Sequence, residues 1–429
     1  MTSTAKRFSD ERARKALLAD CQRLISERAA ANSVAIATAI VDRLGALSEA
    51  TWDRFLADLA NEFAADPAAI LGAAREYAKD RSAERLVDLS RAVEPPRQEL
   101  LRRINRAPGG TAAVLRIRAE LLQRLHAAPD LKLVDHDLLH LLSSWFSPGF
   151  LRMRRVDWTA PAQLLEQLIV HEAVHTIDGW DDLRRRLQPD RRCFAFFHPQ
   201  LADVPLIFVE VALVEALPDR IAPLLDKHST PLDPSRARVA AFYSISNCER
   251  GLRNVSLGNF LLKRVVEELN RELSQVKTFC TLSPIPGFAR WLRGFGPASL
   301  THAQEVAELA AAERSILELA VEGRWDMLVH EPERLQLSSR AQRSLARLCA
   351  IFLVHCSATE NGDPVARFHL DNGARLEQLR PNANASKSGL EQSYGYMVNY
   401  LYDLRKIESN HESFTRGEVK HSRAIAALL

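Results

Sequence analysis

The residues best suited to joint chemistry gather between Ala240 and Phe288, where a strand pattern, a glycine-containing loop and a helix pattern follow one another. A strand that leads into such a loop at the start of a helix presents unpaired backbone N–H groups, which bind anions. Gly251 and Gly258 allow the backbone to approach a ligand closely, and Arg253 adds a phosphate-binding side chain. The loop therefore predicts a phosphate site, with a plain strand-to-helix turn as the alternative.

A serine and a histidine lie where predicted strands end. The strand pattern Val276–Leu282 stops at Ser283, because the two prolines that follow remove N–H donors and fix φ. This segment is not a G-x-S-x-G elbow and does not indicate a hydrolase nucleophile. We also predict a strand over Val365–Leu370, which places His369 near a strand end, before an Asp-Asn-Gly turn signal. An ordinary turn serine and a core histidine are the alternatives.

A second motif, His171-Glu172-Ala173-Val174-His175, matches H-E-x-x-H, in which two histidines one helical turn apart bind zinc and a glutamate acts as base. The predicted helix Ala162–His175 would carry it, and Glu210 or Glu215 would be the third ligand. No second zinc motif follows, and pairs of this kind arise by chance in a chain with 13 histidines. A zinc peptidase is therefore the weaker alternative.

Composition indicates an ordinary globular protein. With 57 basic and 54 acidic residues the formal net charge is +3, which is too balanced to indicate a nucleic-acid partner. The basic runs Arg152–Arg155, Arg184–Arg186 and Arg191–Arg192 are expected to be solvated faces, with acidic groups of a ligand or a partner subunit as the alternative for Arg184–Arg192. No apolar run reaches about 18 residues, the length of a membrane helix. The six scattered cysteines predict reduced, mostly buried thiols, and the absence of a signal-peptide pattern predicts a cytoplasmic location.

The chain changes character after Ser147-Pro148-Gly149. Residues 1–146 show apolar residues at helical spacing and breaks at proline and glycine, which predicts an all-helical bundle. Residues 147–429 mix both patterns, so the fold class is α+β. The remaining predicted strands are Cys193–Phe197, Leu206–Leu213 and Ala240–Ile245, and the remaining predicted helices are Asn259–Leu273 and His302–Leu319.

Several segments in this order resemble the malonyl-CoA decarboxylase family. They are E-A-V-H with a nearby tryptophan and basic run, R-R-C-F-A-F-F-H, F-Y-S-I-S, L-G-N-F-L-L-K-R-V-V-x-E-L, L-S-P-I-P-G-F and F-H-L-x-N-G-A. Each motif is modest by itself, but together they extend from about residue 145 to Tyr402. The resemblance implies a helical domain over 1–146 and a mixed α/β domain of the acetyltransferase (GNAT) superfold over 147–429.

The resemblance also implies a function: conversion of malonyl-CoA to acetyl-CoA and CO₂, without cofactor or metal. The family's serine and histidine fall on Ser283 and His369, which would also contact the substrate. Its CoA loop falls on Arg253, Asn254, Val255, Ser256, Leu257, Gly258 and Asn259. Ser244 and Tyr394 are candidate supporting residues.

One departure from the family's pattern concerns the CoA loop, since animal members carry an acidic residue where this chain has Ser256. The expected partners are malonyl-CoA or acetyl-CoA and a second copy of the chain in a homo-oligomer, with no nucleic acid and no membrane. A CoA-dependent acyltransferase on the same fold is the alternative function. It would need an acceptor, so incubation with malonyl-CoA alone distinguishes the two.

Overall fold

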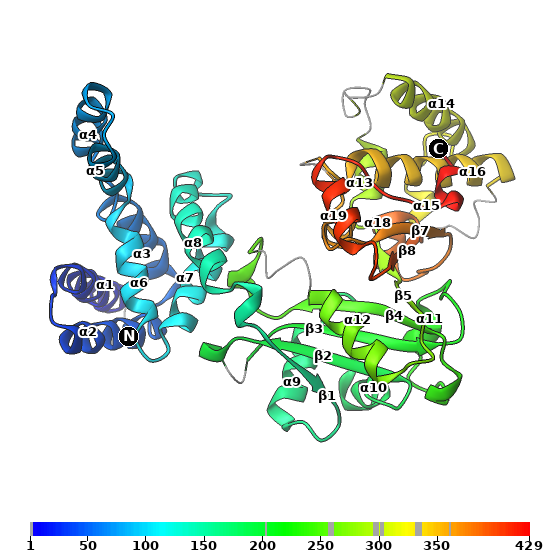
Figure 1. Ribbon diagram of the computed structural model, residues 1–429, viewed down its shortest axis with the longest axis horizontal. Coiled ribbons are helices and arrows are strands. Elements are labelled where there is room, and N and C mark those ends of the chain that lie inside the picture. Colours follow the sequence, from blue (N-terminus) through cyan, green and yellow to red (C-terminus); the bar gives the residue numbers. More distant parts are fainter. Residues whose placement is uncertain are drawn as a thin grey trace. The chain divides into compact units, whose positions relative to one another are not determined.

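The computed structural model describes residues 3–201, 204–255, 261–294, 300, 304–330, 337–359 and 362–429 (Figure 1). It forms two compact units. The first consists of Met1–Arg152, Phe197–Leu206 and Glu249–Leu257, and the second of Met153–Phe196, Ile207–Cys248 and Gly258–Leu429. The division at residues 146 and 147 stays a prediction.

The first unit is helical, as its sequence pattern predicts. Trp52, Phe55 and Leu59 recur at helical spacing and are buried on one side of their helix. The predicted breaks hold, because one helix ends before Pro95 and another begins at Gly110. The helices are α1 (Ser3–Ser26), α2 (Ala30–Gly45), α3 (Glu49–Asn61), α4 (Pro67–Lys79), α5 (Ala83–Val93), α6 (Pro96–Asn105), α7 (Gly110–Arg124) and α8 (Lys132–Trp145).

A mixed sheet dominates the rest of the described chain. Its strands run in the order β1-β2-β3-β4-β5-β8-β6, and β7 also pairs with β8. Because β8 contacts three strands, it joins segments that are far apart in the sequence. The strands are β1 (Arg152–Val156), β2 (Arg191–Phe197), β3 (Pro205–Val214), β4 (Val239–Asn247), β5 (Thr278–Thr281), β6 (Ser283–Pro284), β7 (Arg375–Arg380) and β8 (Met397–Tyr402).

Strands β4 and β5 pair in parallel, with α12 (Leu261–Glu272) in the connection between them. Their register runs from Val239 opposite Thr278 to Phe242 opposite Thr281. Beyond Phe242, β4 continues along β3 with an irregularity at Tyr243, whereas β5 has ended. A helical region followed by this mixed sheet confirms the expected α+β class.

Helices cover both faces of the sheet in the second unit. On one face, Arg192 and Phe196 of β2 contact Glu272 and Arg264 of α12. On the other, Cys193 of β2 lies near Glu210 of β3, which binds Arg186 of α10 (Gly179–Arg186). Figure 1 shows α12 across β2 and β3, with α9 (Ala162–His171) and α10 beside them.

The remaining helices of the second unit lie between strands in the sequence or follow β8. They are α11 (Ala222–Leu225), α13 (Phe288–Arg293), α14 (Gln304–Ala320), α15 (Met327–His330), α16 (Ser339–Ile351) with a π-helical turn at Phe352–Cys356, α17 (Pro364–Asp371), α18 (Lys387–Ser393), α19 (Ile407–Thr415) and α20 (Arg423–Ala426). All six cysteines are buried and unbridged, as predicted. None of the helices among the described residues is long and apolar enough to cross a membrane.

One predicted element is wrong. The segment Val365–Leu370, expected to be a strand, lies in helix α17. The cause is local, because Asp363 accepts hydrogen bonds from the Val365 and Ala366 amides and Pro364 occupies the first helical turn. These N-terminal signals outweigh the short apolar alternation that suggested a strand.

Candidate active site

Ser283 and His369 are brought together, as the sequence predicts. Ser283 lies on β6, where it pairs with Val398 of β8, and His369 lies near the end of α17. The Ser283 Oγ is 2.9 Å from the His369 Nε2. Both side chains are buried, and 86 residues of sequence separate them. The strand end predicted for His369 is wrong, but the meeting with Ser283 is correct.

The imidazole of His369 is held on three sides. Its Nδ1 lies 2.8 Å from the Tyr402 Oη, its ring stacks on Tyr400 at 4.6 Å between centroids, and Phe368 meets it edge-on. Burial lowers the pKa of His369 to about 3, and no charged group contributes to that shift. The imidazole is therefore neutral at physiological pH, in a region without net charge.

The hydrogen-bond order around Ser283 assigns the histidine tautomer. Ser283 donates its hydroxyl to the Thr281 Oγ1 at 2.8 Å, and Thr281 also accepts from the Tyr400 amide. Because the Ser283 hydrogen points to Thr281, the Ser283 Oγ can only accept from His369. The His369 Nε2 therefore carries a hydrogen and donates it to Ser283. The His369 Nδ1 then accepts from Tyr402, whose hydroxyl is kept protonated by burial that raises its pKa. The four side chains form one directed chain.

Asp363 connects the segments that carry the two site residues. One carboxylate oxygen caps α17, and the other accepts from the Gly287 amide at 2.7 Å, in the turn that follows Ser283. There is little room at Gly287, since an added Cβ would lie 3.1 Å from both Asp363 and Phe352. Asp363 is almost fully buried, and this burial raises the pKa of its carboxyl. It therefore fixes the α17 start relative to the Ser283 turn.

The described part of the predicted phosphate loop belongs to the first unit, whereas Ser283 and His369 belong to the second. Its described part runs through a 3-10 turn at Arg250–Leu252 to Val255. Arg253 and Asn254 are exposed, and Asn254 has a left-handed backbone with φ 64°. The predicted ligand residues Ser256, Leu257, Gly258 and Asn259 lie outside the described residues.

The H-E-x-x-H motif does not form a zinc-peptidase helix. Helix α9 ends at His171, so the predicted continuation to His175 is wrong and the two histidines do not share a helix face. Glu172 instead accepts from the Val174 and His175 amides, which folds the chain into a turn. Among the residues that the structure describes, no group of three or more His, Cys, Asp or Glu side chains has a metal-binding arrangement.

Ser244, a candidate supporting residue, belongs to this buried turn. Its hydroxyl lies 2.7 Å from both Glu172 carboxylate oxygens, and Ser246 donates to the same carboxylate. His175 is buried beside Arg186, and burial is the main cause that lowers the pKa of His175 to about 4. These contacts give Ser244 a structural partner of its own, on the other side of the sheet from His369.

The prediction that the basic runs are solvated faces holds for Arg152, Arg154, Arg155 and Arg184, which are exposed, and is wrong for the other four arginines. Arg185, Arg186, Arg191 and Arg192 are all buried. Their guanidinium groups bind acidic residues of the same chain: Arg185 and Arg191 bind Asp190, Arg186 binds Asp182 and Glu210, and Arg192 binds Glu272. Burial is the main cause that raises the pKa of Glu210 to about 7 despite Arg186. These buried arginines therefore stabilise the fold through pairs within the chain.

Tyr394 has an unusual conformation but no hydrogen bond to the pair. It has a left-handed backbone with φ 52° at the end of α18, and its ring meets Phe288 edge-on at 6.2 Å. None of the hydrogen bonds found among the described residues joins it to Ser283 or His369. Its supporting role stays a prediction.

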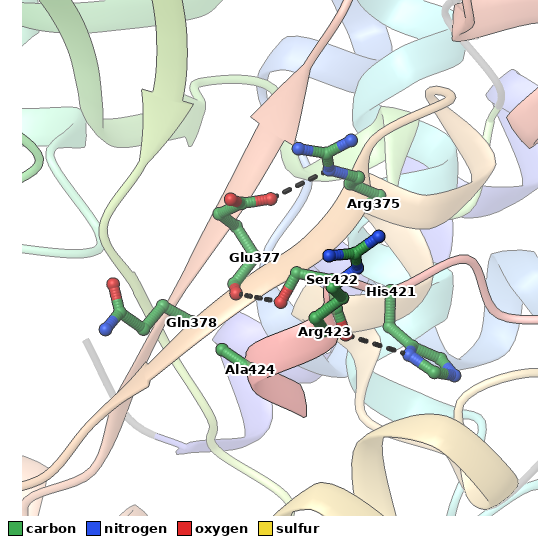
Figure 2. Close-up of a pocket in the computed structure, with 7 residues that line it drawn as sticks. All are labelled: Arg375, Glu377, Gln378, His421, Ser422, Arg423 and Ala424. Atoms are coloured by element: carbon green, nitrogen blue, oxygen red, sulfur yellow. Dashed lines mark hydrogen bonds and ion pairs between the residues drawn. The ribbon is translucent and has the colours of Figure 1, made fainter. Parts of the chain in front are cut away.

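A pocket of about 460 Å³ lies between β7 and α20 and contains none of the predicted site residues (Figure 2). Arg375 is paired with Glu377 of the same strand, and the Ser422 hydroxyl donates to the Glu377 carbonyl. The Ser422 hydrogen bond joins the C-terminal segment to β7. The pocket is lined by Arg375, Glu377, Gln378, His421, Ser422, Arg423 and Ala424.

Sequence reasoning missed Tyr402, Tyr400, Thr281 and Asp363. The two tyrosines alternate along β8 with period 2, and β8 itself was not predicted. The Asp-Pro pair at Asp363 is a helix-start signal that could have identified both α17 and this carboxylate. Nothing in a single sequence shows that β8 lies beside β5 and β6.

The site thus defines a class: an α+β protein with a buried, uncharged Ser–His pair in its mixed-sheet region. Comparison with known proteins is consistent with this. The malonyl-CoA decarboxylase C-terminal domain matches residues 149–429 and the N-terminal domain of the same family matches residues 63–146. The chain belongs to the malonyl-CoA decarboxylase family, a family of carboxy-lyases.

Individual relatives support this assignment. The mitochondrial malonyl-CoA decarboxylase of Rattus norvegicus is 35% identical in an alignment of 361 residues, and the match covers 79% of this chain and 72% of that protein. The crystal structure of malonyl-CoA decarboxylase from Rhodopseudomonas palustris has a TM-score of 0.86 at 45% identity and covers 96% of this chain and 99% of its own. The enzyme structure from Agrobacterium vitis has a TM-score of 0.82 at 45% identity, with the same coverage.

Proposed function

We propose that this protein converts malonyl-CoA to acetyl-CoA and CO₂, with His369 delivering the proton and Ser283 as its hydrogen-bonded partner. The observation that carries the proposal is the 2.9 Å contact between the Ser283 Oγ and the His369 Nε2 in a buried, uncharged setting. It stands beside membership of a family whose relatives are named for this reaction.

The lack of charge around His369 favours loss of CO₂. No charged group among the described residues contributes to the pKa of His369, so a malonyl carboxylate there would lose water and gain no counter-ion. Cleavage of the bond between the carboxylate and the α-carbon removes this penalty, because CO₂ is neutral. The electron pair moves to the α-carbon and the thioester oxygen as an enolate, which backbone N–H donors stabilise by about 3 kcal/mol each.

The proton for the α-carbon passes through His369. The negative charge that develops on the enolate beside the neutral buried imidazole favours the charged form of the imidazole, so loss of CO₂ raises the pKa of His369 from its low value. The imidazole thus takes a proton from solvent and gives it to the enolate carbon. The balance is one malonyl-CoA and one proton in, and one acetyl-CoA and one CO₂ out. Proton transfer of this kind contributes roughly 10²–10⁴ in rate.

Ser283 and Tyr402 hold the imidazole for this step. Tyr402 donates to the Nδ1 and thereby keeps the hydrogen on the Nε2, which faces Ser283. When the substrate binds, the Ser283 hydroxyl turns from the Thr281 Oγ1 to donate its hydrogen to the substrate carboxylate, and it forms no covalent acyl intermediate. The CoA portion is bound by Arg253, Asn254, Val255, Ser256, Leu257, Gly258 and Asn259, through backbone amides and arginine.

The test incubates the purified protein with malonyl-CoA alone and measures acetyl-CoA and CO₂. Both products should form without an acceptor, whereas an acyltransferase would need one. His369→Ala and Ser283→Ala should lower kcat by about 10²-fold or more if both residues serve proton transfer. Turnover close to the wild type in either variant removes that residue from the mechanism, and no acetyl-CoA from the wild type refutes the reaction.

A further inference from the structure

Arg118 of α7 lies fully buried under the proposed CoA loop. Its Nη1 donates to the carbonyl oxygens of Gly251 and Arg253, each at 2.7 Å, and its Nε binds the Asp135 carboxylate of α8 at 2.9 Å. All these residues belong to the first unit. A single guanidinium from the helical region therefore satisfies two main-chain carbonyls of the loop, a fork geometry that arginine provides.

Gly251 makes a second contact between the loop and α7. A Cβ added to it would lie 2.4 Å from the Leu115 carbonyl oxygen and 3.0 Å from the Leu115 Cα, so the loop touches the α7 backbone directly. Only glycine fits there, because backbone atoms cannot move aside as a flexible side chain can. The Glu249 carboxylate also accepts from the Gly251 amide, which fixes the start of the turn.

These anchors determine what the loop presents outward. With the carbonyls of Gly251 and Arg253 turned toward Arg118, the side chains of Arg253 and Asn254 are exposed. Asn254 has φ 64°, a left-handed conformation that costs free energy and persists only when its surroundings hold it. Leu252 and Val255 are buried on either side of it. The loop is thus preorganised by α7.

We propose that Arg118 is a positioning residue for substrate binding: the helical region, through Arg118 and the Gly251 contact, holds the loop in the shape that binds the phosphates of CoA. This inference rests on the proposed function of the loop. Preorganisation lowers the ordering cost of binding. The contact should therefore control KM for malonyl-CoA and leave the chemistry of Ser283 and His369 unchanged.

The experiment compares two substrates, malonyl-CoA and the malonyl thioester of N-acetylcysteamine, which lacks the nucleotide and its phosphates. The test variants are Arg118→Gln and Gly251→Ala, with Arg118→Lys in case the neutral change prevents folding beside Asp135. Each should raise KM for malonyl-CoA about tenfold, since hydrogen bonds from a charged donor and a backbone contact are lost. For all three variants, kcat with malonyl-CoA and kcat/KM with the truncated thioester should stay at wild-type values.

Two control variants match the chemistry elsewhere in the first unit. Arg103 also donates to two main-chain carbonyls, those of Leu24 and Glu27, and Gly45 has open space where a Cβ would stand. Arg103→Gln and Gly45→Ala should leave the preference for malonyl-CoA unchanged. Thermal unfolding of every variant reports the folded fraction.

Three outcomes would overturn the proposal. If Arg118 and Gly251 variants keep the wild-type KM while Arg253→Ala raises it, the loop binds CoA without help from α7 and the proposed function survives. If the variants lose activity toward both thioesters equally, Arg118 has only a general structural role. If the wild type uses both thioesters with equal kcat/KM, the loop does not bind the CoA phosphates, so this inference and the proposed role of the loop both fail while the proposed decarboxylation stands.

Discussion

Replacement of His369 by glutamine should make the protein less sensitive to acid. The imidazole is fully buried, and burial lowers its pKa from 6.5 to about 3. In the unfolded chain the same group binds a proton below about pH 6.5. Between these two values the unfolded state binds more protons than the folded state, so the free energy of unfolding falls as pH falls.

The magnitude follows from the pH interval. One pH unit below the unfolded pKa corresponds to about 1.4 kcal/mol, so from about pH 7 to about pH 5 His369 removes about 2 kcal/mol of stability. Urea unfolding at the two pH values measures this change. The wild type should lose about 2 kcal/mol more than His369→Gln, because the glutamine has no proton to bind.

Two further variants define the comparison. His175, whose pKa burial lowers to about 4, should show a change of similar size and the same sign when replaced by glutamine. His126 is exposed and serves as the matched control for the substitution itself. If His369→Gln and the wild type lose equal stability on acidification, the folded protein admits a proton to His369. The neutral imidazole on which the mechanism depends would then be wrong.

Four other measurements test the site. Tyr402→Phe removes the 2.8 Å hydrogen bond to the His369 Nδ1 and should lower kcat by roughly 10-fold with little change in KM; an unchanged kcat would show that the tautomer needs no support. The kcat of the wild type should fall as pH rises, since the imidazole must bind a proton in the complex; a profile that rises instead contradicts His369 as donor. Asp363→Ala removes the α17 cap and the Gly287 contact, so urea unfolding should show a loss of about 2 kcal/mol or more. Ser244→Ala removes a hydroxyl donor from the buried Glu172 carboxylate and should lower the free energy of unfolding by about 1–3 kcal/mol in the same assay. A variant as stable as the wild type would show that the carboxylate does not need this hydrogen bond.

Local signals in the sequence were enough to predict the helical region and four of the eight strands among the described residues, β2 to β5. The apolar runs of β2 and β3, the stripe of apolar residues in α12 and the proline breaks of the helical region all appear where the sequence pattern places them. The failures are also local. In α17, a capping aspartate and a proline start a helix where a strand was predicted. After α9, the Glu172 carboxylate accepts from the Val174 and His175 amides, so the helix ends at His171, before the motif is complete.

The candidate site was predictable only in part, because its geometry depends on strand pairing. Ser283 and His369 could be chosen from their motifs, but Tyr402 lies 33 residues beyond His369, on a strand whose position beside β5 no periodicity reveals. The buried arginines also show that a single sequence does not reveal contacts between distant segments. Arg186 looks solvated within its basic run, yet it binds Glu210, which lies 24 residues away on another strand. A run of charged residues can be predicted to be solvent-exposed only when the positions of acidic residues on neighbouring strands are known. Here the fold brings such acidic side chains into contact with the basic run.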